Sequence, residues 1–526
     1  MTRSEMLQRV QAGDGLWDFI IVGGGATGLG VAVDAASRGY RTLLLEQSDF
    51  AKGTSSRSTK LAHGGVRYLQ QGNVSLVLEA LRERGLMRQN APHLVRDLPF
   101  VVPNYVWWDK PFYGVGLWVY DKMAGKMGFG RSRTLSREQT LERIPTVETQ
   151  GLRGGVVYYD GQFDDARLAV NLAQTAAEQG AVVLNYMRVT KLVKQAGVIT
   201  GVAATDAETG QAYEFKAKVV INATGVYTDA VRRMDDADAP AMIRPSQGAH
   251  IVLDRSFLPG DAAIMVPHTD DGRVLFAIPW LNRVMVGTTD TAVDETPLEP
   301  RPLQAEVDFL LSHAGRYLVN DPEPADVLSV FAGLRPLVVS SGSGEKGDKR
   351  TSVISRDHTI HISETGLVTV AGGKWTTYRK MAEDVVEQAA SLAGLDMKPC
   401  VTQTLAIHGH HENAAEFDEL SAYGADAPAV RELIDSDPAY GERMHANLPY
   451  RVGEAVWAAR NEMARTVEDV LARRTRALLL DARASVAAAP KVAKVLAAEL
   501  GHDDAWAERE VLAYTDLARQ YVLPLA

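Results

Sequence analysis

The chain has 526 residues, a formal net charge of −10 and a single cysteine. This length predicts more than one domain, and the acidic balance argues against a nucleic-acid partner, because phosphate backbones require a broad excess of Lys and Arg. Cys400 cannot form an internal disulfide, which fits a reducing compartment such as the cytoplasm. The N-terminus lacks the apolar core of a signal peptide, and no stretch approaches the roughly 18 apolar residues of a spanning helix. We therefore expect any membrane contact to be peripheral.

Residues 17–46 have the pattern of a β-α-β unit that opens on a glycine-rich turn. A short apolar run meets the turn, a helix-length segment rich in Ala and Val follows, and a second apolar run ends at Glu46. Backbone N–H groups at such a turn approach a pyrophosphate at the helix N-terminus. Glu46 lies where a carboxylate accepts hydrogen bonds from a ribose hydroxyl and repels a 2′-phosphate, which disfavours NADP. The glycines that match G-x-G-x-x-G are Gly23, Gly25 and Gly28.

Two later segments favour FAD over NAD as the dinucleotide. Residues 219–231 and 366–390 each read as a strand that ends in glycine before a helix. The second places Gly373 and Lys374 before a helix that begins near Thr376, and the positive end of a helix suits an anionic reduced isoalloxazine. An NAD enzyme has no need of a third strand-turn-helix so late in the chain.

The remaining patterns divide the chain into three parts. Alternating strand patterns dominate from about 245 to 340, and from about 400 onward the sequence is dense in Ala, Leu, Arg and Glu, which is typical of helices. We predict an α/β FAD-binding domain with an α+β insertion and an all-α C-terminal domain. The predicted bounds are 14–95, 155–240 and 350–395 for the discontinuous FAD-binding domain, 96–154 and 241–349 for an antiparallel-sheet substrate domain, and 400–526 for the helical domain.

Several motifs carry a family resemblance over nearly the whole chain. They include "GTSSRSTKLAHGGVRYL", "YYDGQFDDARL", "INATGVYTD", "GAHIVL", "VGTTDT", "GLRPL", "AGGKWTTYRKMAED" and "EMARTVEDVLARRTRALLLDA". With them the chain resembles the FAD-dependent glycerol-3-phosphate dehydrogenases, the quinone-linked relatives of glycerol-phosphate oxidase, which have a glutathione-reductase-like fold. The last motif separates this family from amino-acid oxidases of the same fold.

The resemblance implies a reaction. A hydride moves from C2 of sn-glycerol 3-phosphate to flavin N5 and a base takes the hydroxyl proton, which yields dihydroxyacetone phosphate; the electrons then pass to a membrane quinone. Three alternatives stay open. An oxidase would pass the electrons to oxygen and release H2O2, the substrate could be an amino acid or a 2-hydroxy acid, and a flavin-binding module would lack this catalysis.

An anion clamp and a base are the protein groups that this reaction needs. Arg335 lies between apolar residues and a proline, which is an unlikely place for a charge that faces solvent. Its planar guanidinium can bind two phosphate or hydroxyl oxygens. The alternative is a structural salt bridge. By resemblance, Arg67 and Tyr68 line the substrate pocket. His63 and His250 are the candidate bases, since the ordinary pKa of histidine suits proton abstraction near neutrality. We favour His63 because it shares a segment with Arg67 and Tyr68.

Other predicted contacts with the cofactor come from hydroxyl-rich or glycine-rich turns. Lys374 serves either the substrate phosphate or the N1/O2 edge of the flavin, and the sequence does not choose between them. The histidines of "HGHH", 408–411, read as a solvated loop, so we expect no metal site, and Cys400 lies outside the flavin motifs, so we expect no thioether to FAD. The predicted cofactor contacts outside 23–46 are Thr54, Ser55, Ser56, Ser58, Lys60, His63, Ala223, Gly225, Gly373, Lys374 and Thr376.

The segment 102–133 combines aromatic and basic side chains, as interfacial membrane contacts do. We predict that it docks on the cytoplasmic membrane surface, where the quinone is reduced. The alternative is that these aromatics pack in the substrate-domain core or in the contact of a homodimer. The side chains concerned are Tyr105, Trp107, Trp108, Lys110, Phe112, Tyr113, Trp118, Tyr120, Lys122, Lys126, Phe129 and Arg131.

Overall fold

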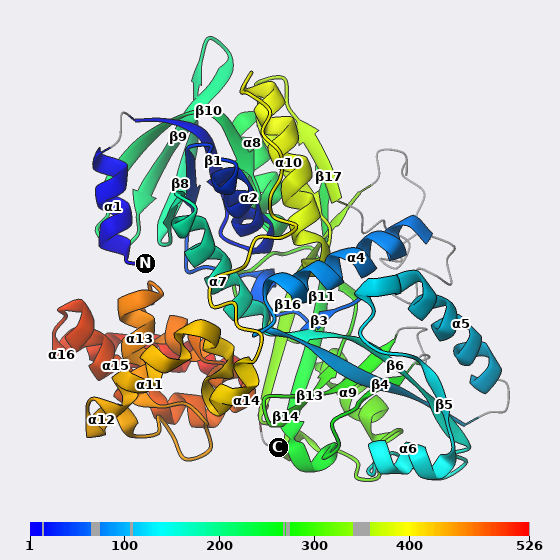
Figure 1. The fold of residues 1–526 in the computed structure, drawn as a ribbon. Helices are drawn as coiled ribbons and strands as arrows, with labels where there is room; N and C mark the ends of the chain where they lie inside the picture. The colour runs from blue at the N-terminus through cyan, green and yellow to red at the C-terminus, as the bar shows by residue number, and fades with distance from the viewer. Residues whose placement is uncertain are drawn as a thin grey trace.

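Two sheets and a group of helices make up the molecule (Figure 1). The computed structural model describes residues 1–12, 15–64, 74–105, 109–266, 269, 274–339 and 358–524. In Figure 1 the first sheet lies at the top, the second sheet at the lower right and the C-terminal helices at the lower left. This arrangement confirms the predicted architecture of an α/β cofactor domain, a second sheet and a helical domain.

The first sheet is parallel at its centre. Its inner strands are apolar and buried towards their carboxyl ends, as expected for parallel strands that are covered on both faces. The strand order is β17 (His358–Ile362), β18 (Val368–Gly372), β10 (Ala212–Asn222), β1 (Leu16–Val22), β2 (Thr42–Leu45) and β7 (Val182–Leu184), with the antiparallel β8 (Met187–Gln195) and β9 (Val198–Asp206) leading into β10.

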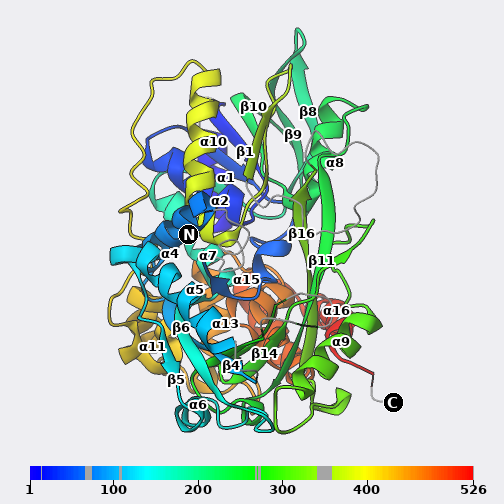
Figure 2. The ribbon, with the colours of Figure 1, turned by 90° about the vertical axis from the view of Figure 1, so that its right-hand side faces the viewer.

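Helices pack on both faces of this sheet. The helix α2 (Ala26–Ser37) packs between α10 (Tyr378–Leu392) and α7 (Asp165–Glu178). Gly30 permits the close contact with α10, because an added Cβ there would lie 2.9 Å from Cδ2 of Tyr378. Figure 2 shows α10 on one side of the sheet and α8 (Thr228–Asp235) on the other, next to β8 and β9.

The second sheet is antiparallel except where β12 pairs with β4. Residues 155–163, predicted to belong to the FAD-binding domain, lie in this sheet, because β6 pairs with β4 and with β3. The strand order is β15 (Thr291–Ala292), β11 (Ile243–Asp254), β14 (Arg283–Gly287), β13 (Leu275–Trp280), β12 (Ala263–Val266), β4 (Val95–Asn104), β6 (Gly154–Phe163) and β3 (Leu61–Ala62), and β16 (Ser329–Val338) pairs with β11 and β5 (Arg133–Leu135) with β6.

Helices border the second sheet, and two long strands link it to the first. The end of β16 contacts β18, so β11 and β16 run from one sheet towards the other (Figure 2). The helices that pack around the second sheet are α4 (Val74–Asn90), α5 (Asp109–Ala124), α6 (Arg137–Arg143) and α9 (Gln304–Gly315).

The C-terminal part is helical, as predicted. Between residues 400 and 524, all of which the structure describes, every named element is a helix. Its apolar residues share one core with the second sheet, and the turn Asp469–Arg474 faces the first sheet. The helices are α11 (Ala427–Asp435), α12 (Pro438–Gly441), α13 (Val452–Asn461), α14 (Ala477–Leu480), α15 (Ala482–Leu500) and α16 (Asp504–Ala518).

Candidate active site

Three glycine-rich turns lie at the same edge of the first sheet. They follow β1, β10 and β18, which are parallel neighbours, so their carboxyl ends meet at one edge. The turns span residues 23–28, 223–225 and 372–374. The crevice outside the carboxyl ends of parallel strands is where open α/β sheets bind nucleotides.

The first turn has no room for side chains. Gly23 has φ +110°, and a Cβ there would lie 2.7 Å from the carbonyl oxygen of Ala223. A Cβ on Gly28 would overlap the carbonyl oxygen of Gly23. Gly25 caps α2, and the N–H of Ala26 donates to Ser55 Oγ at 2.9 Å. The turn thus presents backbone to a ligand at a helix N-terminus, which fits a pyrophosphate.

Glu46 lies beside this turn. Its carboxylate accepts the N–H of Gly24 at 2.6 Å and the N–H of Ser48 at 2.9 Å. Burial raises the pKa of Glu46, and these two hydrogen bonds oppose that rise. A carboxylate has about four lone-pair sites, so two stay available to ribose hydroxyls.

The second and third turns complete the edge. Gly225 and Gly373 have φ +60° and +79°, and a Cβ on Gly373 would overlap Sδ of Met381. The short helical turn η7 (Trp375–Thr377) follows, with Thr376 buried. The indole of Trp375 donates to the carbonyl oxygen of Ser55 at 2.8 Å, which ties this turn to the first one.

The loop 54–60 connects these turns to the second sheet. Thr54 Oγ1 donates to the carbonyl oxygen of Leu334 in β16 at 2.6 Å. Thr59 Oγ1 lies 3.0 Å from Nε2 of His250 in β11. The start of the loop therefore touches β16 and, through Ser55, the cofactor turns, while Thr59 touches a predicted base.

Lys60 has a structural role in place of the predicted cofactor contact. Its ammonium is fully buried and donates to Asp165 at 2.7 Å and to the carbonyl oxygens of Ser56 and Ser58 at 2.8 and 3.1 Å. An ammonium has three donors, and these acceptors use all of them. Ser58 also donates its hydroxyl to Asp165, at 2.7 Å. Burial lowers the pKa of Lys60 to about 8, with Asp165 opposing.

Arg335 lies on β16 beside β11, with its guanidinium 25% exposed. It donates to Thr288 Oγ1 at 3.1 Å, to the carbonyl oxygen of Thr289 at 3.0 Å, and to Asp290 at 3.3 Å. The ion pair with Asp290 fixes the plane of the guanidinium. A Cβ on Gly248 would lie 2.8 Å from Arg335 Cζ, so the absence of a side chain there makes room for the arginine.

His250 lies four positions from Ser246, the register partner of Arg335. Its ring is 2% exposed and stacks on Phe331 with centroids 4.8 Å apart. Burial lowers the pKa of His250 well below its ordinary value, and the charges of Lys60 and Arg335 lower it further. The imidazole is therefore uncharged near neutral pH, as a general base must be.

The other candidate base, His63, contacts a different element from His250. The backbone N–H of His63 donates to Thr376 Oγ1 at 3.3 Å, which places His63 beside the third turn together with Lys374. Arg67 and Tyr68 fall outside the described residues. The structure thus places His250 on the strand that pairs with the strand of Arg335, and His63 beside Thr376.

Several residues of this site were missed in the sequence analysis. Thr59 contacts a candidate base, and Thr288 and Asp290 hold Arg335. Asp165 anchors the loop 54–60. They lie in motifs quoted for the resemblance, but a hydroxyl or carboxylate in such a motif does not by itself indicate its partner.

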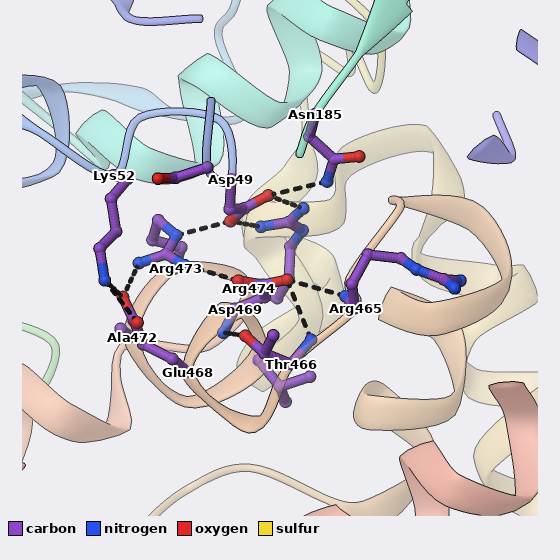
Figure 3. A network of polar contacts seen from close by, with 12 residues as sticks. Asp49, Lys52, Asn185, Arg465, Thr466, Glu468, Asp469, Ala472, Arg473 and Arg474 are labelled. Carbon is purple, nitrogen blue, oxygen red and sulfur yellow. Dashed lines mark hydrogen bonds and ion pairs between the residues drawn. The ribbon is translucent and has the colours of Figure 1, made fainter. Parts of the chain in front are cut away.

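A buried network of charges joins Asp49 and Lys52, just before the loop 54–60, to the helical domain (Figure 3). Asp49 is 0% exposed and accepts Arg473 Nε at 2.5 Å and two donors of Arg474 at 2.6 and 2.8 Å. Although burial opposes ionisation, the two guanidiniums hold the pKa of Asp49 well below its ordinary value. Lys52 pairs with Glu468 at 2.5 Å in the same network.

The histidine cluster and the cysteine lie away from the site. Nε2 of His408 lies 2.7 Å from Oδ2 of Asp426, and its Nδ1 lies 2.5 Å from Oε1 of Glu178. Although burial opposes it, these hydrogen bonds raise the pKa of His408 to about 9. No group of metal-ligating side chains occurs among the described residues. Cys400, which follows α10 in the chain, donates its thiol hydrogen to Asp34 of α2 at 3.0 Å.

The aromatic segment divides between surface and core. On α5, Trp118 is 57% exposed and Lys122 Nζ lies 5.7 Å from its ring centroid, whereas Tyr120 is 1% exposed. Phe129 is also buried, and Trp107 and Trp108 lie outside the described residues. Within the described chain, no helix is long and apolar enough to cross a membrane.

The fold and the glycine turns define a dinucleotide-binding oxidoreductase, and comparison with known proteins defines it further. Residues 18–379 match the family described as FAD dependent oxidoreductase, and residues 363–507 match the C-terminal domain of alpha-glycerophosphate oxidase. The chain is 41% identical to the mitochondrial glycerol-3-phosphate dehydrogenase of Macaca fascicularis, over 93% of this chain and 71% of the relative. For the mitochondrial enzyme of Schizosaccharomyces pombe the identity is 39%, over 94% and 86%.

A solved structure agrees. The glycerol-3-phosphate dehydrogenase from Bacillus halodurans complexed with FAD superposes with a TM-score of 0.80 at 29% identity, covering 100% of this chain and 98% of the other. The chain therefore belongs to the FAD-dependent glycerol-3-phosphate dehydrogenase family, as the motifs predicted. Its cofactor is FAD, and the three glycine turns with Glu46 are the residues that fit it.

Proposed function

We propose that the protein oxidises sn-glycerol 3-phosphate to dihydroxyacetone phosphate, with bound FAD as the hydride acceptor, and passes the electrons to a membrane quinone. One observation carries the proposal: a partly exposed arginine and a neutral histidine lie on paired strands next to the loop that touches the cofactor turns. A substrate with a phosphate and an oxidisable alcohol needs such a cation and such a base. The names of the relatives support this substrate.

In this proposal Arg335 binds phosphate or hydroxyl oxygens, with Asp290 and Thr288 holding its plane. His250 accepts the proton of the C2 hydroxyl, since burial keeps the ring uncharged. We favour His250 over His63 because it lies on the strand that pairs with the strand of Arg335, and the charge of Arg335 acts on its ring. The predicted roles of Arg67, Tyr68, His63 and Lys374 in the substrate pocket stay predictions.

Anaerobic reduction of the flavin tests the proposal. The purified yellow protein is mixed with sn-glycerol 3-phosphate while the oxidised flavin absorbance is followed, with glycerol and lactate as controls. We expect bleaching with sn-glycerol 3-phosphate and none with the controls. An absorbance that stays unchanged, or that lactate or an amino acid bleaches instead, would overturn the proposed substrate.

The acceptor and the membrane contact require separate measurements. We propose that the exposed face of α5, with Trp118 and Lys122, lies on the cytoplasmic membrane surface. Trp118→Asp should weaken flotation with anionic liposomes and reduction of a quinone analogue, whereas Trp506→Asp, at the start of α16, should change neither. If oxygen re-oxidises the reduced flavin faster than a quinone does, and is itself reduced to H2O2, the protein is an oxidase.

A further inference from the structure

We propose that Arg476, in the helical domain, is a positioning residue of the active site: with Asp165 it holds the loop 56–60, and through Thr59 it fixes the ring of His250. The catalytic consequence rests on the proposed function, because there His250 acts as the base. The contacts of Arg476 and Asp165 with the loop, and of Thr59 with His250, do not depend on that function.

The side chain of Arg476 extends from the helical domain to the loop 56–60. It is 2% exposed, and its Nη2 donates to the carbonyl oxygen of Ser56 at 2.9 Å and to Asp165 Oδ1 at 3.1 Å. The guanidinium also lies 5.6 Å from the ring centroid of Trp280, in the second sheet. One side chain thus contacts the loop, the start of α7 and the second sheet, which makes it a junction of the domains.

Asp165 is the partner that this arginine shares with the loop. It is 0% exposed and accepts the N–H and the hydroxyl of Ser58 at 3.1 and 2.7 Å, and the ammonium of Lys60 at 2.7 Å. The carbonyl oxygen of Ser56 accepts both Arg476 and Lys60. The loop is therefore held at residues 56, 58 and 60 by charge-assisted hydrogen bonds, which are stronger than neutral ones.

Thr59 is the loop residue that carries this order to the site. Its neighbours Ser58 and Lys60 are both held by Asp165, and its own Oγ1 lies 3.0 Å from His250 Nε2. On the second sheet the ring of His250 stacks on Phe331, over which Lys60 Nζ lies 5.4 Å from the centroid. The ring orientation, and the nitrogen that carries its proton, thus depend on where the loop places the hydroxyl of Thr59.

An arginine suits this position better than a lysine. The planar guanidinium presents several donors at fixed angles and reaches a carbonyl and a carboxylate together, whereas an ammonium is a compact point charge. Arg476→Lys keeps the charge and removes the fork, so the loop is expected to shift while the charge balance with Asp164 and Asp165 is kept.

The test compares this variant with a matched arginine of the same domain. Arg474→Lys also removes the fork of a fully buried arginine, but that arginine bonds Asp49 and not the loop 56–60. The first readout is the side-chain NMR signals of His250 in holoprotein with isotope-labelled histidine, assigned with His250→Asn and followed against pH. The groups that face this ring are Lys60, Arg335 and Thr59. The second readout is anaerobic flavin reduction by sn-glycerol 3-phosphate.

We expect Arg476→Lys to shift the His250 signals and their titration, and to lower the rate of flavin reduction about 10-fold or more with KM changed less than about 2-fold. Arg474→Lys should lower the unfolding temperature and leave the His250 signals as in the wild type. Thr59→Val removes the contact directly and should reproduce the His250 change, so it still tests the link between the loop and His250 if Arg476→Lys does not fold.

Unchanged His250 signals in Arg476→Lys, or in Thr59→Val, would overturn the inference. The same shift in Arg474→Lys would also overturn it, because the effect would then belong to any loss of domain contact. If wild-type flavin is not reduced by sn-glycerol 3-phosphate, the proposed function fails, and the NMR comparison still decides whether Arg476 positions His250.

Discussion

Removing the charge of Asp49 should strongly destabilise the contact between the cofactor domain and the helical domain. Asp49→Asn keeps the shape of the side chain but leaves Arg473 and Arg474 without the carboxylate that accepts three of their donors at 2.5 to 2.8 Å. Arg473 retains ion pairs with Glu468 and Asp469, whereas the nearest remaining carboxylate of Arg474, Glu462, is 3.8 Å away. Loss of one partner from a buried pair costs about 3–5 kcal/mol.

Thermal unfolding followed by circular dichroism measures this effect. At neutral pH we expect the apparent midpoint of Asp49→Asn to fall by about 10 °C, since each kcal/mol corresponds to roughly 2–4 °C for a cooperative unit of about 150–250 residues. Asp97→Asn is the matched control, because it removes the same charge from a surface pair with Arg88 that is 37% exposed and should cost about 1 kcal/mol or less. Equal midpoints for the two variants would refute the reasoning.

The same contact predicts an acid limit of stability. The pKa of Asp49 is lower in the folded than in the unfolded protein, so its contribution is complete above the unfolded pKa of about 3.9 and disappears as the pH falls towards the folded pKa. Wild-type stability should therefore fall below about pH 4, and Asp49→Asn should show a smaller fall over the same range. An equal fall in both proteins would show that other carboxylates set the acid limit.

Three further predictions concern the cofactor, the substrate and alkaline pH. Gly28→Ala should be purified without yellow colour, because its Cβ would overlap the carbonyl oxygen of Gly23; a variant with a full flavin spectrum would contradict the proposed cradle. Arg335→Lys should lower kcat/KM for sn-glycerol 3-phosphate about 100-fold, which corresponds to the loss of one or two charged hydrogen bonds. An unchanged kcat/KM in anaerobic flavin reduction would show that Arg335 does not bind the substrate. The folded pKa of His408 is raised to about 9, so its contribution to stability, on the order of 2 kcal/mol, should be complete below about pH 6.5 and lost as the pH rises to 9. His408→Gln should remove this slope in urea titrations, and a slope that persists in the variant would refute the assignment.

Local patterns predicted the cofactor half of the protein. The turn at Gly23–Gly28, the following helix and Glu46 lie within one β-α-β unit, so spacing alone indicates how they meet. The helical texture after residue 400 likewise reflects short-range periodicity. The family motifs added the cofactor and the substrate class.

The remaining features depend on contacts between distant residues. Thr59 and His250 are 191 positions apart, and Arg476 and Asp165 are 311 apart, so no local pattern connects them. Lys60 stands in a Ser/Thr-rich stretch that reads as a ligand loop, yet its charge is neutralised by an acid from α7. The strand β6 reads as an apolar run that would suit either sheet, because the pattern of a strand does not identify its neighbour.

The strand order of the first sheet also sets the order in which the protein can assemble during translation. The strand β1 pairs with β10, and β10 with β18, so the three cofactor turns cannot come together before residue 374 has left the ribosome. At about 5–20 residues per second this takes on the order of 20–70 s, during which the free edges of the early strands are open to non-native pairing. The arginines that bind Asp49 and Ser56 emerge roughly 100 residues later still. Nascent chains of this protein are therefore expected to need chaperone protection until the last domain is complete.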